Sequence, residues 1–169
     1  MNIALIGMMG SMKSSVAKEL AAVTGMPSAD TDDIFAYENG ISIAKAFALH
    51  GEEFFRQKET EIITRLTKND GQIISCGGGL PIKPENRAAL SGCCVIWLTA
   101  SANVIFGRLK NDKTRPLLQD KSIEKIERLI AERTPVYAEC ADITVDTDGR
   151  LPREIAKECF EKANKYLEL

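Results

Sequence analysis

The chain has 169 residues, a net charge of −2 and an isoelectric point near 5.6, with 44% hydrophobic and 27% charged residues. This length fits one globular domain that buries its own core, and the charge gives no reason to expect nucleic acid as a partner. The sequence contains no run of about 18 apolar residues, so no membrane-spanning helix is predicted. Its five cysteines lack a CxxC spacing, which fits a reduced, cytoplasmic protein.

Apolar runs with strand character alternate with helical patterns along the chain. The runs span residues 2–7, 71–77, 93–98 and 141–146, and a further strand is expected to end near Asp30. Helical spacing of apolar residues follows Ser14, surrounds 62–66, spans 104–109 and 123–130, and resumes after Pro152. This alternation predicts an α/β protein with a parallel sheet covered on both faces, built as a single domain over residues 1–169.

The first strand leads into a segment typical of a phosphate-binding loop. Gly7, Lys13 and Ser14 occupy their positions in G-x-x-x-x-G-K-[ST], but Met12 replaces the second glycine. In such loops backbone N–H groups hold phosphates, the lysine reaches the outer phosphates and the hydroxyl binds Mg²⁺. If the loop needs a positive φ at position 12, a side chain there costs about 1–3 kcal/mol. The alternative is an ordinary strand-to-helix turn with a solvated lysine.

Two carboxylates follow the second expected strand. Asp30 and Asp32 are two residues apart in the stretch "SADTDDIF". The carboxyl ends of parallel strands face the ligand crevice of an α/β protein, so one carboxylate is expected to serve a hydrated Mg²⁺ and the other a substrate hydroxyl. The alternative is that the pair caps a helix or a turn.

A charged pair interrupts an apolar helical stripe further along the chain. Glu59 shares a face with Phe55 and Ile62, and Arg56 lies one turn before it. Buried charges need partners, so this pair predicts either a binding site or an internal ion pair. The three glycines that follow Cys76, at positions 77–79, predict a close approach of ligand to backbone.

Three further arginines are candidates for binding anions. Arg133 extends an apolar stripe near the expected end of a helix at Pro135, and it either grips a carboxylate or extends from the stripe into solvent. Arg108 and Arg115 flank the start of a polar segment, residues 110–122, that is expected to close as a lid over phosphates.

Taken together, these segments resemble the shikimate kinases, which belong to the P-loop kinases of the nucleoside monophosphate kinase type. The resemblance runs in order through "GMMGSMKSS", "DTDDIF", "GEEFFRQKE", "CGGG", "RPLL", "ERTPVY" and "VDTDGRLP". It implies a three-layer α/β/α fold with a five-stranded parallel sheet, an acceptor-binding segment at 31–60 and a lid at 110–122. It also implies transfer of the ATP γ-phosphate to the 3-hydroxyl of shikimate, on the route to chorismate, by a monomer that uses Mg²⁺.

The resemblance also implies roles for individual residues. Lys13, Asp32 and Arg115 would act in catalysis, with Asp32 as candidate base and Arg115 on the transferring phosphate. Ser14 and Asp30 would hold the metal. Nucleotide contacts would come from Gly10, Ser11, Met12, Lys13, Ser14, Ser15, Arg108, Arg115, Arg150 and Pro152. Shikimate contacts would come from Asp32, Arg56, Gly77, Gly78, Gly79 and Arg133, with Glu59 orienting Arg56.

Two departures from the family pattern leave two rival hypotheses open. Phe35 stands where the family usually has an acid, which is expected to affect packing only, whereas Met12 bears on ATP affinity and rate. The first rival is a shikimate-binding protein whose nucleotide chemistry is impaired by Met12. The second is a gluconate-type small-molecule kinase with the same loop, which the carboxylate-binding pair Arg56 and Arg133 disfavours.

Overall fold

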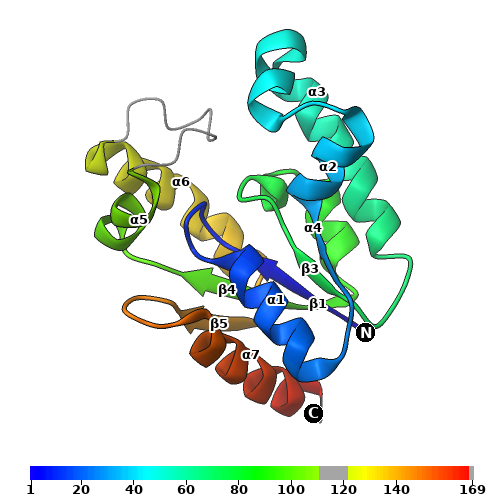
Figure 1. Cartoon of the computed structure of the whole chain (residues 1–169), viewed down its shortest axis with the longest axis vertical. Helices are drawn as coiled ribbons and strands as arrows, with labels where there is room; N and C mark the ends of the chain where they lie inside the picture. The colour runs from blue at the N-terminus through cyan, green and yellow to red at the C-terminus, as the bar shows by residue number, and fades with distance from the viewer. Residues whose placement is uncertain (111–121, 168–169) are drawn as a thin grey trace.

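The structure is a computed structural model that describes residues 1–110 and 122–167. Its centre is a five-stranded parallel sheet with the strand order β2-β3-β1-β4-β5 (Figure 1). The strands are β1 (Asn2–Ile6), β2 (Ser28–Asp30), β3 (Ile73–Ser75), β4 (Cys93–Thr99) and β5 (Ile143–Asp146). The predicted three-layer fold with five parallel strands is therefore confirmed.

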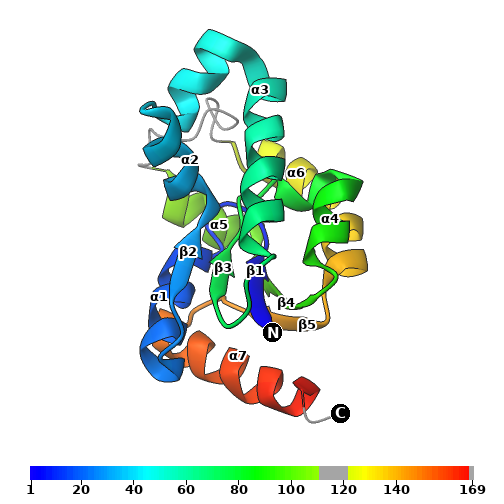
Figure 2. The ribbon, with the colours of Figure 1, turned by 90° about the vertical axis from the view of Figure 1, so that its right-hand side faces the viewer.

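Helices cover both faces of this sheet. They are α1 (Lys13–Thr24), α2 (Thr31–Asn39), α3 (Ile43–Leu66), the 3₁₀ helix η1 (Leu80–Ile82), α4 (Pro84–Leu90), α5 (Ala102–Leu109), α6 (Ile123–Cys140) and α7 (Pro152–Leu167). Side chains alternate between the faces of a strand, so Ile3 and Leu5 pack with α1 and α7 while Ala4 and Ile6 pack with α3 and α6. Figure 2 shows these two layers from the side.

The strand register brings the candidate residues to one edge of the sheet. Asp30 and Leu5 both pair with Ser75, so the ends of β2, β3 and β1 lie level with one another. Ligands of open parallel sheets bind beyond these carboxyl ends. The helices α2 and α3 stand on one side of this edge and α5 on the other (Figure 1).

A third cluster of apolar side chains joins α2 to α3. Phe35 is fully buried there, and its ring meets the Phe55 ring edge-on with centroids 4.9 Å apart. The aromatic residue at position 35 therefore contributes packing, as expected. Helix α3 is interrupted at Gly51, where φ is 81° and ψ is 169°.

One predicted boundary is wrong. Pro135 does not end its helix, because α6 continues to Cys140. The backbone bond that proline removes is offset by tertiary packing, since Tyr137 in the next turn is 1% exposed and belongs to the main core cluster. The five cysteines, all of which are described, are free thiols. Among the described helices, none is long and apolar enough to cross a membrane.

Candidate active site

The phosphate-binding loop connects β1 to α1. Lys13, at the start of α1, folds its ammonium back over the loop and donates to the carbonyls of Gly7 and Met8 at 2.9 and 2.8 Å. Ser11 is fully buried and donates its hydroxyl to the Met8 carbonyl at 2.7 Å. The loop is thus closed around its own lysine, which lies where phosphates would meet the helix N-terminus.

Met12 adopts the conformation that a phosphate-binding loop asks of glycine. Its φ is 64° and its ψ is 21°, in the left-handed region, and no other non-glycine residue in the described parts of the chain has a positive φ. Its carbonyl accepts the first helical bond, from Val16 N at 2.8 Å. This conformation therefore carries a torsional cost for a residue with a side chain.

The left-handed conformation at position 12 predicts that a glycine variant is more stable than an alanine variant there. We expect the variant Met12→Gly to be about 1 kcal/mol more stable than Met12→Ala, although glycine is normally the less stable of the two near a helix. Both variants lose the methionine side chain, so their comparison isolates the Cβ atom. Urea denaturation measures the free energies of unfolding, and an alanine variant as stable as the glycine variant would contradict the strain. We also expect a lower KM for ATP in Met12→Gly than in Met12→Ala, because residue 12 lines a pocket over the loop and alanine keeps a Cβ atom there.

Ser14 and Asp30 place two side-chain oxygen groups next to each other beside the loop. The Ser14 hydroxyl donates to Asp30 Oδ2 at 2.6 Å. The other oxygen of Asp30 accepts from the backbone N–H of Asp32 at 2.9 Å, so Asp30 caps α2 at the same time. The capping interpretation of this residue is therefore confirmed, and its role at a metal stays a prediction. Asp32 follows in the first turn of α2, where the helix dipole favours a carboxylate.

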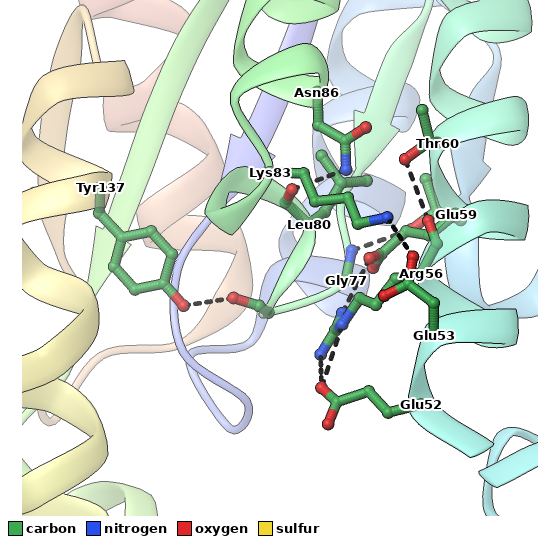
Figure 3. A network of polar contacts seen from close by, with 12 residues as sticks. Glu52, Glu53, Arg56, Glu59, Thr60, Gly77, Leu80, Lys83, Asn86 and Tyr137 are labelled. Atoms are coloured by element: carbon green, nitrogen blue, oxygen red, sulfur yellow. Dashed lines mark hydrogen bonds and ion pairs between the residues drawn. The ribbon is translucent and has the colours of Figure 1, made fainter.

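A pocket of about 260 Å³ lies between α2, α3 and the glycine segment, which we define as residues 77–79. Arg56 enters it from α3 and Arg133 from α6, and they are 8% and 5% exposed. Arg56 donates to Glu59 and Glu52 at 2.8 and 3.2 Å (Figure 3). Nε and Nη1 of Arg133, by contrast, are buried without a hydrogen-bond partner among the described residues. An anion in this pocket would satisfy them.

Glu59 is the buried partner of Arg56, so the predicted internal ion pair is present, and a binding role of the pair stays a prediction. Its Oε2 accepts from Arg56 Nη1 at 2.8 Å, whereas its buried Oε1 has no partner in the described part of the chain. Burial raises the pKa of this carboxyl to about 7, although the charge of Arg56 opposes the shift. The charge of nearby Asp32 adds to the increase.

The raised pKa of Glu59 predicts a pH-dependent stability. Folded Glu59 holds a proton up to about pH 7 and unfolded Glu59 only to about pH 4.5, so stability falls as pH rises across this window. The variant Glu59→Gln does not titrate. We expect it to gain stability relative to the parent by on the order of 2 kcal/mol between pH 5 and pH 8. The matched control is Glu61→Gln, whose side chain is 60% exposed. Parallel pH profiles for parent and Glu59→Gln in urea denaturation would contradict the assignment.

The glycine segment has no room for side chains. A Cβ atom on Gly77 would lie 2.6 Å from Glu59 Oε1 and 2.8 Å from Asp32 Oδ1. A Cβ atom on Gly78 would lie 3.2 Å from the backbone nitrogen of Met9. Packing of the site's own side chains therefore requires glycine at these positions. The close approach of a ligand to this backbone stays a prediction.

A second pocket of about 280 Å³ lies over the phosphate-binding loop. Its walls include Met12, Lys13, Ser14 and Asp30. Asp32, Gly77 and Gly78 line both pockets. A ligand on the loop and a ligand beside Arg133 would therefore meet at Asp32.

The residues expected to contact the nucleotide beyond the phosphate-binding loop are not all brought together. Arg108 lines the second pocket and donates to the Gly10 carbonyl at 2.8 Å and to Thr147 Oγ1 at 3.1 Å, which ties α5 to the loop. Arg150 instead donates to the Asp146 carbonyl and pairs with Glu158 on α7 at 2.7 Å.

The other expected nucleotide and lid residues have different outcomes. Pro152 begins α7, and Ser15 lies in the first turn of α1 beside the second pocket. Arg115 and all of the predicted lid except its end residues lie outside the described residues.

Two residues that hold the glycine segment were not among the predicted site residues. Thr31 is 1% exposed and accepts from the Gly77 N–H at 2.9 Å, and Tyr137 donates to the Gly78 carbonyl at 2.5 Å. The signal for Tyr137 was available, because it lies four residues after Arg133 and therefore shares its face of α6. Thr31 sits between the two aspartates and carried no signal of its own.

Known proteins match this chain over nearly its full length. A family model described as shikimate kinase matches residues 9–164. A shikimate kinase of Dehalococcoides mccartyi is 37% identical over 166 residues, covering 98% of this chain and 94% of that protein. The solved structure of shikimate kinase from Acinetobacter baumannii in complex with shikimate is 30% identical, with a TM-score of 0.95 and coverage of 98% and 93%.

A gluconokinase is a more distant match. The structure from Sinorhizobium meliloti is 18% identical with a TM-score of 0.56, over 99% of this chain and 96% of that one, which shows a shared fold only. The family model, in contrast, covers most of this chain, and the shikimate kinases named above match it at 30% and 37% identity over nearly its full length. The chain belongs to the shikimate kinase family and is an ATP-dependent small-molecule kinase.

Proposed function

We propose that the pocket between α2, α3 and the glycine segment binds shikimate, and that the pocket over the phosphate-binding loop binds ATP. The observation that carries this proposal is the wall that the two pockets share, made of Asp32, Gly77 and Gly78. Phosphoryl transfer requires donor and acceptor to meet in line, and catalysis then consists of positioning and charge stabilisation. The 3-hydroxyl of shikimate would meet the γ-phosphate beside Asp32.

The acceptor carboxylate would bind between Arg133 and Arg56. Arg133 brings two buried donors without partners among the described residues, and a carboxylate accepts two parallel bonds from one guanidinium. Arg56 already donates to both Glu59 and Glu52, which fixes the plane of its guanidinium. A gluconate-type acceptor would also offer a carboxylate, so the identity of the acceptor rests on the family together with this geometry.

The residues beside the loop fit a magnesium ion. Mg²⁺ prefers oxygen ligands and binds proteins through few carboxylates while it keeps waters and phosphate oxygens. The Ser14 hydroxyl and the Asp30 carboxylate, 2.6 Å apart, supply such oxygens at the edge of the nucleotide pocket. A bound Mg²⁺ would neutralise charge on the phosphates. In this proposal Ser14 and Asp30 would hold the ion.

The remaining steps belong to side chains of this chain. Asp32 would orient the acceptor hydroxyl and take its proton as the new P–O bond forms. Lys13 would exchange the carbonyls of Gly7 and Met8 for phosphate oxygens, which gives its charge a stronger partner. Arg115, in the proposed lid of residues 110–122, would add positive charge to the transferring phosphate.

Release of ADP in the presence of different acceptors tests this function. We expect turnover with shikimate, and rates with gluconate or without acceptor that stay at the background of ATP hydrolysis. A chain that binds shikimate in calorimetry but releases no ADP would instead be the binding protein with impaired nucleotide chemistry. Turnover with gluconate but not with shikimate would show that the chain is a gluconate-type kinase.

A further inference from the structure

Tyr137 lies on α6 and reaches the glycine segment from the side opposite Arg56 and Glu59 (Figure 3). Its hydroxyl donates to the Gly78 carbonyl at 2.5 Å, and its ring packs 5.8 Å from the Trp97 ring. Burial raises the pKa of this hydroxyl, so it remains a donor at neutral pH. Tyr137 is 1% exposed, so the bond lies largely out of contact with water.

This bond sets the direction of the next peptide group. The C=O and N–H of a trans peptide point in opposite directions, so a Gly78 carbonyl held toward α6 turns the Gly79 N–H away from α6. Gly79 forms part of the wall of the acceptor pocket. No acceptor for its N–H occurs among residues 1–110 and 122–167. A backbone donor is thus presented to the pocket.

Arg133 lies against the same peptide. A Cβ atom on Gly78 would lie 3.4 Å from Arg133 Nη1, one of the two guanidinium nitrogens that lack a described partner. Arg133 and Tyr137 are four residues apart on α6 and so project from one face of it. The helix therefore delivers the guanidinium and the hydroxyl that orients the neighbouring peptide as one unit.

We propose that Tyr137 is a positioning residue for the acceptor carboxylate, holding the Gly78–Gly79 peptide so that the Gly79 N–H and the Arg133 guanidinium address the same anionic group. This inference rests on the proposed function, because it takes the acceptor to carry a carboxylate. The tyrosine hydroxyl touches neither substrate nor nucleotide in this arrangement. Its contribution is to acceptor affinity and not to the chemical step.

The variant Tyr137→Phe tests this role, because it keeps the ring and removes only the hydroxyl. We expect the KM for shikimate to rise about five- to tenfold, while kcat at saturation and the KM for ATP stay within about twofold. The matched control is Tyr166→Phe, which removes a hydroxyl that donates to Asp142 at 2.7 Å on the surface. KM does not depend on the fraction of enzyme that folds, so a loss of stability does not obscure the result.

Shikimate methyl ester, which lacks the anionic carboxylate, gives the second measurement. In calorimetry the parent and Tyr137→Phe are expected to bind the ester equally, although they differ for shikimate. An unchanged shikimate KM, or an equal weakening of ester and acid, would overturn the positioning role. The variant Arg133→Met separates this failure from that of the proposed function. If the pocket does not take the carboxylate, Arg133→Met leaves the shikimate KM unchanged; if only Tyr137 is misassigned, Arg133→Met still raises it.

Discussion

The variant Asp32→Asn is expected to lower kcat by about 10²–10⁴-fold, the usual contribution of a positioned general base. Asp32 lies in the shared wall of the two pockets, so its carboxylate is placed where the acceptor hydroxyl would meet the γ-phosphate. Asparagine keeps the size of the side chain but cannot take a proton. Coupled assay of ADP release at saturating ATP and shikimate measures the loss.

Asp33→Asn is the matched control for Asp32→Asn. It removes the same charge from the same turn of α2, but its exposed side chain lines only the acceptor pocket and not the wall that the two pockets share. We expect its kcat to stay within about twofold of the parent, because a surface charge contributes little through solvent. Equal losses in the two variants would show that the charge of the helix terminus matters, and that Asp32 is not the base.

The fold was predictable because its signals are local. Continuous apolar strands at 2–7 and 93–98 alternate with helical spacing, and this pattern fixes a parallel sheet with covered faces. The β2 strand is only three residues long, and the two aspartates near its end located it better than its apolar content did. The helix end predicted at Pro135 was wrong. Proline removes one helical bond, whereas the buried ring of Tyr137 stabilises the continuing helix through contacts with residues distant in the sequence.

The candidate site was predictable to the extent that its residues break a pattern. Glu59 stands out as a charge on an apolar stripe, and three consecutive glycines stand out after a strand. The partners of these residues were not predictable. That the Gly77 N–H would find Thr31, or that Arg108 would hold the Gly10 carbonyl, depends on the positions of segments 46 and 98 residues apart in the chain.

The free protein holds several charges and torsions that folding alone does not favour. Glu59 is a buried carboxyl with one oxygen lacking a described partner, and Met12 is a left-handed non-glycine residue. Glu59 lines the pocket beside Arg133, and Met12 lines the pocket over the phosphate-binding loop. Strain of this kind persists where a ligand or a reaction gives it a use, and it is compensated by packing elsewhere. Arg133 is the clearest case. The two nitrogen atoms that are buried without a described partner are also the ones proposed to bind the acceptor carboxylate.

Arg133→Met is therefore expected to change affinity and stability in opposite directions. Methionine fills much of the buried volume without a charge. It removes Nε and Nη1, which lack a partner among the described residues, so the free energy of unfolding should rise by about 1 kcal/mol or more. The same change removes the charge-assisted bonds to the acceptor, and the shikimate KM should rise by about a hundredfold while the ATP KM stays nearly constant. Urea denaturation without ligand and steady-state kinetics measure the two effects. Arg128→Met, on an exposed position of α6, is the matched control and should change neither. A less stable Arg133→Met would show that the guanidinium is already paired in the free protein, and an unchanged shikimate KM would remove Arg133 from the acceptor site.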